Sequence, residues 1–114
     1  MFGFQSLNVY KKAQNFNVEV RKFLNRNNFD YSTENQLRRA ALSVVLNISE
    51  GNGRFTDKDR RRFFIMSRSS LFECVGVFDT LILEESMKRE KYNSLMKLAE
   101  ELSRIIYTMI KNLS

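Results

Sequence analysis

Proline is absent from this chain of 114 residues, and glycine occurs only four times. Folds built from strands and tight turns depend on both residues, because proline and glycine supply the backbone conformations that turns require. Their scarcity therefore favours a fold made of helices. A chain of this length forms one domain, so we expect a single domain over residues 1–114.

Four segments of the chain repeat apolar residues at steps of three and four. The second segment carries, on a single stripe, Leu37, Ala41, Val44 and Ile48. This spacing is that of the buried face of an amphipathic α-helix. We therefore expect helices over residues 6–25, 33–51, 56–85 and 88–112. Because the connections are short, the sequence predicts an all-α fold, an antiparallel up-down-up-down four-helix bundle.

Capping signals mark some of these boundaries. Thr33 with Gln36 three residues later predicts a capping box at the start of the second helix. The run Gly51-Asn52-Gly53 predicts backbone with positive φ where that helix ends. Thr56, followed by two aspartates, predicts the N-cap of the third helix. The junction between the third and fourth helices has neither glycine nor proline.

Histidine is absent, and Cys74 is the only cysteine. A zinc site of cysteine and histidine ligands is therefore excluded, as are an internal disulfide and a serine or cysteine nucleophile with a histidine base. A metal site built from carboxylates remains the formal alternative. We expect a protein that is not an enzyme and that binds no metal, cofactor or small-molecule substrate.

No stretch of the chain approaches the roughly 18 consecutive apolar residues of a membrane span. The first residues also lack the basic and then apolar pattern of a secretory signal. We therefore expect a cytoplasmic protein without a membrane partner.

Positive charge predominates, because 19 basic side chains face 13 acidic ones and give a net charge of +6. The first group of candidate nucleic-acid-binding residues is Arg54, Lys58, Arg60, Arg61 and Arg62; the second group is Lys11, Lys12, Arg21, Lys22 and Arg26. Arginine contacts phosphate through a planar pair of hydrogen bonds, which suits a nucleic acid. The alternative is a solvated basic face whose charges pair locally. Since helix-turn-helix, zinc-finger and basic-zipper patterns are missing, we expect recognition by charge and shape.

Polar residues lie beside the apolar stripes of the second and third helices. At helical spacing these are Ser43, Asn47, Glu50, Ser70 and Glu73. If the two helices pack together, two carboxylates and an amide meet near the intervening turn. We expect a buried structural network of hydrogen bonds. The alternative is a carboxylate pair for acid–base chemistry, with Glu50 and Glu73 as the catalytic groups.

The chain also has more apolar residues than its four stripes use. The third helix carries further apolar side chains, namely Phe63, Ile65, Phe72, Val75 and Ile82. Exposed aromatic residues are common on protein surfaces, but large apolar patches usually mark association. We therefore expect a homo-oligomer.

Three segments together resemble one known family. SVVLNISEGNGR at residues 43–54 resembles the hallmark "S…NI-EG-GR" of the bacterial four-helix-bundle proteins called 23S ribosomal RNA intervening-sequence proteins. FFIMSRSSLFE at residues 63–73 resembles the family's "F…A-GS-E", and LNVYKKA at residues 7–13 its opening "L-VW-KA". The chain departs from the pattern at Tyr10, where tryptophan is usual, and at Ser67 and Ser69, where alanine and glycine are usual.

The resemblance implies an antiparallel four-helix bundle that assembles into a ring-like homopentamer. The family also includes relatives of the accessory variability determinant proteins of diversity-generating retroelements, which are basic pentamers that bind nucleic acid and a reverse transcriptase. It implies no enzyme active site.

These observations lead to one functional hypothesis and one alternative. We expect a non-enzymatic, basic, oligomeric protein that binds structured RNA or other nucleic acid. The alternative is an accessory subunit, for example of a reverse transcriptase, whose protein partner holds the nucleic acid.

Overall fold

The computed structural model describes residues 2–113, and throughout that range the regular structure is helical, without strands. A short 3-10 helix, η1 (Gly3–Ser6), precedes four α-helices. These are α1 (Asn8–Asn25), α2 (Tyr31–Asn52), α3 (Asp57–Leu83) and α4 (Arg89–Asn112). The predicted all-α fold with four helices is confirmed. The first α-helix begins two residues later than expected, because residues 3–6 form the tighter 3-10 turn.

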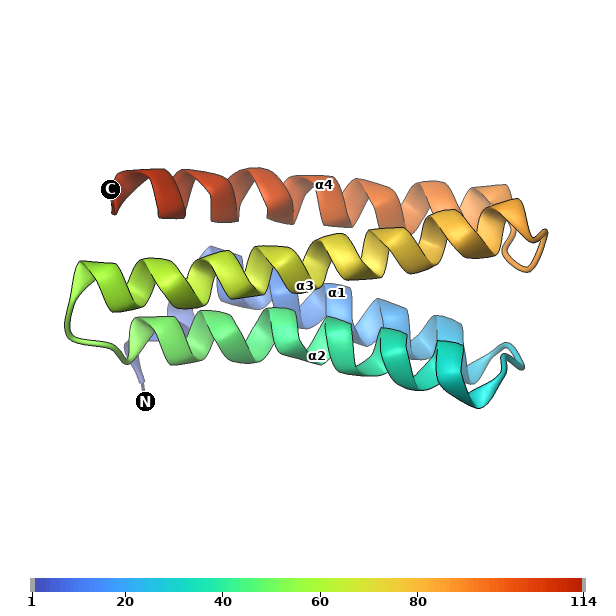
Figure 1. Ribbon diagram of the computed structural model, residues 1–114, viewed down its shortest axis with the longest axis horizontal. Coiled ribbons are helices and arrows are strands. Elements are labelled where there is room, and N and C mark those ends of the chain that lie inside the picture. The colour runs from blue at the N-terminus through green and yellow to red at the C-terminus, as the bar shows by residue number, and fades with distance from the viewer. Residues whose placement is uncertain (1, 114) are drawn as a thin grey trace.

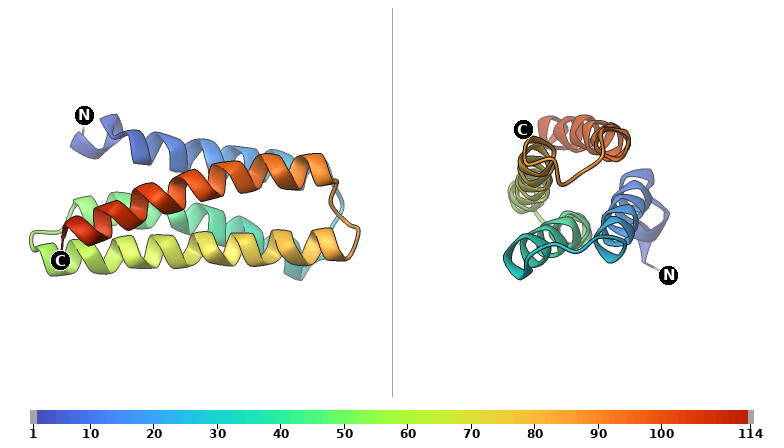
Figure 2. Two further views of the ribbon diagram at one scale, coloured as in Figure 1. Left: turned by 90° about the horizontal axis from the view of Figure 1, so that it is seen from above. Right: turned by 90° about the vertical axis from the view of Figure 1, so that its right-hand side faces the viewer.

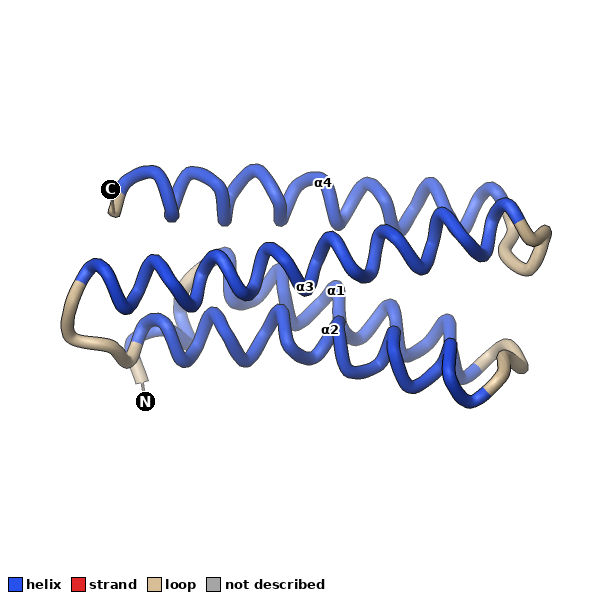
Figure 3. Tube along the Cα trace, in the orientation of Figure 1, coloured by secondary structure: helices blue, strands red, loops and turns tan. Residues whose placement is uncertain are grey.

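The four helices lie side by side along the longest axis of a molecule that measures 44 × 27 × 22 Å. Figure 1 shows the α1–α2 and α3–α4 connections at one end and the α2–α3 connection at the other, so consecutive helices run in opposite directions. Seen along the axis, the helices surround a common centre (Figure 2). The connections are short loops (Figure 3). The connecting loops therefore lie at the two ends of the bundle, and the four helices form its sides.

The apolar stripes meet in the centre of the bundle. Phe16 of α1 and Phe78 of α3 are fully buried and contact each other edge to face, with ring centroids 6.3 Å apart. Leu37, Leu95 and Ile106 are equally buried. Each such side chain stabilises the fold by about 1.5–3 kcal/mol relative to exposure in the unfolded chain. The core thus follows the periodic stripes of the first three helices, whereas in α4 Ile106 is fully buried and the expected stripe residue Ile105 is half-buried.

Small residues bring α2 and α3 close together. Ser67 is the one fully buried polar residue within residues 2–113, and its hydroxyl donates a 2.8 Å hydrogen bond to the carbonyl oxygen of Val44. Ala40 and Ala41 are also buried. Because Ser67 bonds to the backbone of the neighbouring helix, it fixes the register of α3 against α2 without leaving an unpaired hydroxyl.

The start of α2 differs from the expected capping box. Asp30, not Thr33, is the N-cap: its carboxylate accepts hydrogen bonds from the Thr33 amide at 3.1 Å and the Thr33 hydroxyl at 2.6 Å. These bonds, the hydroxyl first, lower the pKa of Asp30. The prediction at Thr33 was wrong because Asp30 caps the helix three residues earlier, so α2 begins at Tyr31 and Thr33 lies inside its first turn.

The prediction of positive φ at the end of α2 was also wrong. Gly53 closes the helix with a φ of −86°, in the ordinary right-handed region. The left-handed conformation occurs instead at Glu85, with a φ of 60°. There the Ser86 amide bonds the Leu81 carbonyl and the Glu85 amide bonds the Ile82 carbonyl. This pair of bonds is a Schellman motif, and it ends α3 two residues earlier than expected, without glycine.

The predicted N-cap of α3 agrees with the structure. The Thr56 hydroxyl oxygen accepts a 3.1 Å hydrogen bond from the Asp59 amide. The cap fixes where α3 starts, and hence where the basic residues that follow it emerge.

Gly51 is required for space. A Cβ atom built there lies 2.6 Å from Phe64 Cε1 and 3.2 Å from Phe63 Cβ, whereas one built at Gly76 has no atom within 4 Å. We expect Gly51→Ala to lower the free energy of unfolding by about 1–3 kcal/mol, because the added methyl group would force the buried Phe64 ring to shift. Urea unfolding measures this.

Gly76→Ala is the matched control. In the exposed middle of α3, and at a protein concentration low enough to keep the chain monomeric, it should raise the free energy of unfolding by about 0.5–1 kcal/mol, since alanine favours helix over glycine. Equal effects of the two variants would contradict the packing argument.

Candidate nucleic-acid interface

Five basic residues gather where α2 connects to α3. Because α3 starts at Asp57, its first two turns and the preceding loop lie at one end of the bundle (Figure 1). We call this set the basic end; it consists of Arg54, Lys58, Arg60, Arg61 and Arg62. The structure therefore brings the whole first group of sequence-predicted residues to one place.

Two of these arginines pack against one aromatic ring, that of Phe63. The guanidinium carbons of Arg54 and Arg62 lie over the Phe63 ring, 4.5 and 4.6 Å from its centroid. Such contacts contribute about 0.5–1 kcal/mol each at exposed sites. The same two side chains help to bury Phe63, which is only 8% exposed. Phe63 was predicted as surplus apolar surface, and instead it supports the basic end.

The local ion pairs of the basic end are weak. Arg54 Nη2 lies 3.3 Å from a Glu50 oxygen, and Arg62 Nε lies 3.9 Å from an Asp59 oxygen. Arg60 Nε donates a 2.9 Å hydrogen bond to the Arg54 carbonyl and so ties the loop to α3. Exposed pairs of this kind contribute about 0–1 kcal/mol. A polyanion can therefore displace them at small cost.

Lys58 and Arg61 project from the surface. Both are exposed, and Arg61 borders a shallow depression that also contains Phe72 and Tyr107. The basic end thus combines these two exposed cations with three arginines, among them the exposed Arg62, that contact neighbouring groups.

The second predicted group does not form one patch. Lys12 pairs with Glu101 of α4, and this contact lowers the pKa of the Glu101 carboxyl. Lys22 lies 3.5 Å from Glu19 on its own helix. Arg21 is half-buried, with its Nε atom enclosed, while Lys11 is exposed.

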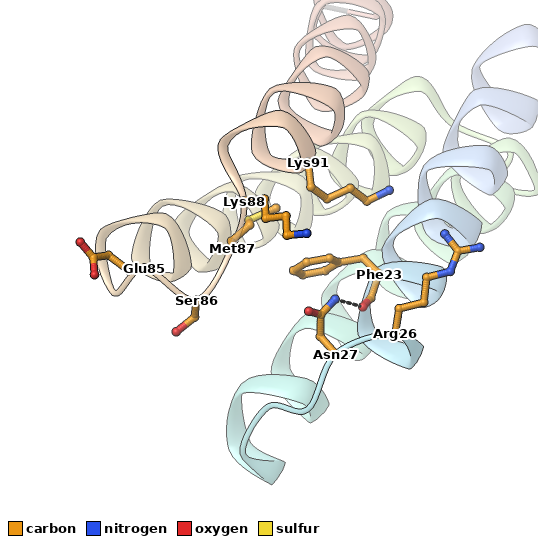
Figure 4. A pocket seen from close by; sticks show the side chains of 8 residues that line it. All are labelled: Phe23, Arg26, Asn27, Glu85, Ser86, Met87, Lys88 and Lys91. Atoms are coloured by element: carbon orange, nitrogen blue, oxygen red, sulfur yellow. Dashed lines mark hydrogen bonds between the residues drawn. The ribbon is translucent and has the colours of Figure 1, made fainter.

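Arg26 belongs instead to a pocket at the opposite end from the α2–α3 loop. The pocket has a volume of about 520 Å³ between the end of α1 and the start of α4. Figure 4 shows Arg26, Lys88 and Lys91 with the Phe23 ring between them, while Glu85 and Ser86 lie to one side. Lys91 has one distant carboxylate neighbour, Glu19 at 4.0 Å. Sequence reasoning missed both lysines, because only the fold brings α4 beside α1.

The expected polar network forms in part. Asn47 Nδ2 donates to the Ser43 hydroxyl at 2.9 Å, and the Ser43 and Ser70 hydroxyls lie 2.8 Å apart. Ser70 in turn donates to the Met66 carbonyl at 3.1 Å. The direction of these bonds is consistent, since each hydroxyl accepts one and donates one. The chain of bonds links α2 to α3 beside the buried Ser67.

Both carboxylates of the expected network lie outside it. Glu50 and Glu73 are exposed; Glu50 turns to Arg54, and Glu73 borders a shallow depression beside Arg39. The prediction of a buried five-residue network was therefore wrong for these two residues, because their helix positions face solvent at the rim of the α2–α3 contact. The structure provides no enclosed carboxylate pair at this point.

Metal-binding and nucleophilic groups are not assembled in the described part of the chain. Residues 2–113 contain no group of three or more Cys, Asp or Glu side chains placed to hold a metal ion. Cys74 is buried in the core, and its burial, with a smaller contribution from Glu73, raises the pKa of the thiol to about 12. None of the helices in this range is long and apolar enough to cross a lipid bilayer.

Fold and surface together define a class, that of a small four-helix-bundle protein with one strongly basic end. The chain belongs to the 23S rRNA-intervening sequence protein family, whose model matches residues 5–108. This confirms the family that the sequence motifs predicted.

A solved structure shares the fold. A protein of unknown function from the S23 ribosomal protein family of Bacteroides thetaiotaomicron is 24% identical, with a TM-score of 0.84 over 90% of this chain and 98% of that one. At this identity the likeness establishes the common fold. Neither the family's description nor that of the Bacteroides protein names a catalytic activity. No curated protein matches the chain.

The buried thiol gives a direct test of the core. Because folding raises its pKa above the ordinary value of 9.0, the thiol's contribution to stability is intact below pH 9 and declines as the pH rises toward 12. We expect Cys74 to resist a disulfide reagent at pH 8 in the folded protein and to react fully in urea. Rapid stoichiometric labelling of the folded protein would contradict its burial.

Proposed function

We propose that this protein binds structured RNA or other nucleic acid, without catalysis, through the charge and shape of its surface. The observation that carries the proposal is the convergence of five cationic side chains at one end of the bundle. These five cations outnumber the three neighbouring acids, Glu50, Asp57 and Asp59, and an excess of positive charge creates a potential that attracts a polyanion. The family description, which refers to 23S rRNA, supports RNA as the first ligand to test.

The chemistry of the basic end suits phosphate. Four of its five members are arginines, whose planar groups bind phosphate oxygens in pairs. Positive charge near the N-terminus of α3 interacts unfavourably with the helix dipole. Asp57 and Asp59, in the first turn, offset part of this repulsion. A bound phosphate chain would offset the same repulsion while releasing counterions. The cytoplasmic location expected from the sequence would bring the protein together with RNA.

Neutralising the basic end tests the proposal. We expect Arg60→Gln, Arg61→Gln and Arg62→Gln, combined in one variant, to weaken binding to all nucleic-acid sequences. The slope of log K against log[salt] should fall by about 0.7–0.9 for each phosphate that the variant no longer neutralises. Fluorescence titrations of a structured RNA over a salt series measure both quantities.

The matched control removes the same charge elsewhere. Lys88, Arg89 and Lys97 are exposed at or near the start of α4, toward the opposite end of the bundle (Figure 1), so their triple Gln variant has the same net charge as the test variant. It should keep most of the affinity and slope. If both triple variants lose affinity equally, or neither does, the assignment of the basic end fails. Circular dichroism checks that Arg60→Gln leaves the fold intact.

We further propose that the protein forms a homo-oligomer, and specifically the pentamer that the family resemblance implies. The support is an apolar groove between α3 and α4, with a volume of about 410 Å³. Phe72, Val75, Gly76, Met96 and Ala99 are among its lining residues. Phe72 is 53% exposed and Tyr107, farther along the same helices, is 51% exposed. Burial against a second copy would remove this surface from water.

Gly76 supports close approach by a partner in this groove. A glycine in the middle of a helix costs about 1 kcal/mol relative to alanine, and within residues 2–113 no atom apart from its own helical neighbours lies within 4 Å of the Cβ that Gly76 lacks. The chain's own packing therefore does not require glycine here. Close packing of a helix from a second copy against α3 would require it.

The accessory-subunit alternative uses the same groove. There the groove would bind a different protein, for example a reverse transcriptase, and the relation to accessory variability determinant proteins would extend to function. The two possibilities differ in what the purified protein does alone. Only self-association produces an oligomer in the absence of the partner.

Analytical ultracentrifugation distinguishes these outcomes. We expect the protein to sediment near five times its 13.5 kDa chain mass, and Phe72→Glu to dissociate it, because a buried unpaired carboxylate is costly. Leu83→Glu is the control, since Leu83 is 85% exposed and is not among the residues that line the groove. A 13.5 kDa species for the unmodified protein at all concentrations would refute self-association.

A further inference from the structure

One aromatic side chain at the basic end has no role in the fold. Phe55, in the loop between α2 and α3, is 100% exposed. No other large apolar side chain within residues 2–113 is as exposed. Its neighbour in sequence, Arg54, and the next cation, Lys58, both belong to the basic end.

The position of Phe55 makes its exposure informative. It directly precedes the N-cap Thr56, where an apolar residue often packs against the fourth residue of the helix in a hydrophobic staple. Here that fourth residue is Arg60, whose guanidinium turns instead to the Arg54 carbonyl. Phe55 therefore has no staple partner, unlike Phe63, which the arginines cover.

The surroundings limit what can use this ring. An apolar protein surface docked on Phe55 would also have to desolvate the neighbouring cations, which is unfavourable unless they are paired. An unpaired nucleotide offers both a flat base for the ring and a phosphate for the cations. In a continuous duplex the bases already stack on one another, so a ring at the surface has no exposed base to contact.

We propose that Phe55 is a stacking platform for an unpaired base, so that the ligand of the basic end is a single-stranded or looped segment of RNA. Lys58 and Arg61, both exposed, hold the flanking phosphates. This inference rests on the proposed nucleic-acid binding and adds to it the part of the RNA that is recognised.

The test compares two RNAs with equal numbers of phosphates, a hairpin with a loop of unpaired nucleotides and a blunt duplex. Base stacking on an aromatic side chain contributes about 1–3 kcal/mol per base, so Phe55→Ala should weaken hairpin binding by about 5- to 150-fold. Duplex binding should change little. Phe55→Trp should retain hairpin affinity, and because the chain has no other tryptophan, its fluorescence should be quenched by the hairpin and not by the duplex.

Tyr31→Ala is the control. Tyr31 is 83% exposed at the other end of the bundle, so its loss should leave both affinities unchanged. If the unmodified protein binds hairpin and Phe55→Ala binds it equally well, the stacking platform is refuted while nucleic-acid binding stands. Equal loss of hairpin and duplex binding, or a changed sedimentation mass, would also refute it. If the unmodified protein binds neither RNA, the proposed function itself fails.

Discussion

The close contact between α2 and α3 is the constraint on which the rest of the molecule depends. Gly51 leaves space for the rings of α3, and the buried hydroxyl of Ser67 bonds to the backbone of α2 at Val44. Together they fix the register of the two helices. The short loop between them is thereby fixed as well, and with it the start of α3, where Thr56 caps the helix. The basic end exists as a local surface because this register holds.

The same contact explains how a charged surface sits on a stable core. Phe63 packs beside Gly51 on one side and supports the guanidinium groups of Arg54 and Arg62 on the other. One aromatic residue therefore connects helix packing to the positioning of charge. Phe55 differs in that neither the core nor the arginines cover it. Phe63 therefore supports the basic end from below, whereas Phe55 is free to contact a ligand.

Helical periodicity predicted the helices and most of their buried stripes. A helix that buries one face has an apolar residue about every 3.6 positions, whichever helices lie beside it. Capping was less predictable. Thr56 met its expected role, whereas Asp30 replaced Thr33, since α2 begins two residues before the expected start and Thr33 lies inside it. The end of α3 formed at Glu85 without glycine, because the Schellman bonds compensate a strained residue. Local signals decide a boundary only where a single candidate is present.

The sequence by itself determined the helical class, the core residues, the family and the clustering of Arg54 to Arg62, because all of these depend on residues near one another in the chain. Tertiary structure decided the rest. It directed Glu50 and Glu73 to solvent, paired Lys12 with α4, and placed Arg26 beside Lys88 and Lys91. These outcomes depend on how far each helix is rotated about its axis and on which helix lies next to it. Both are set by packing between residues distant in sequence.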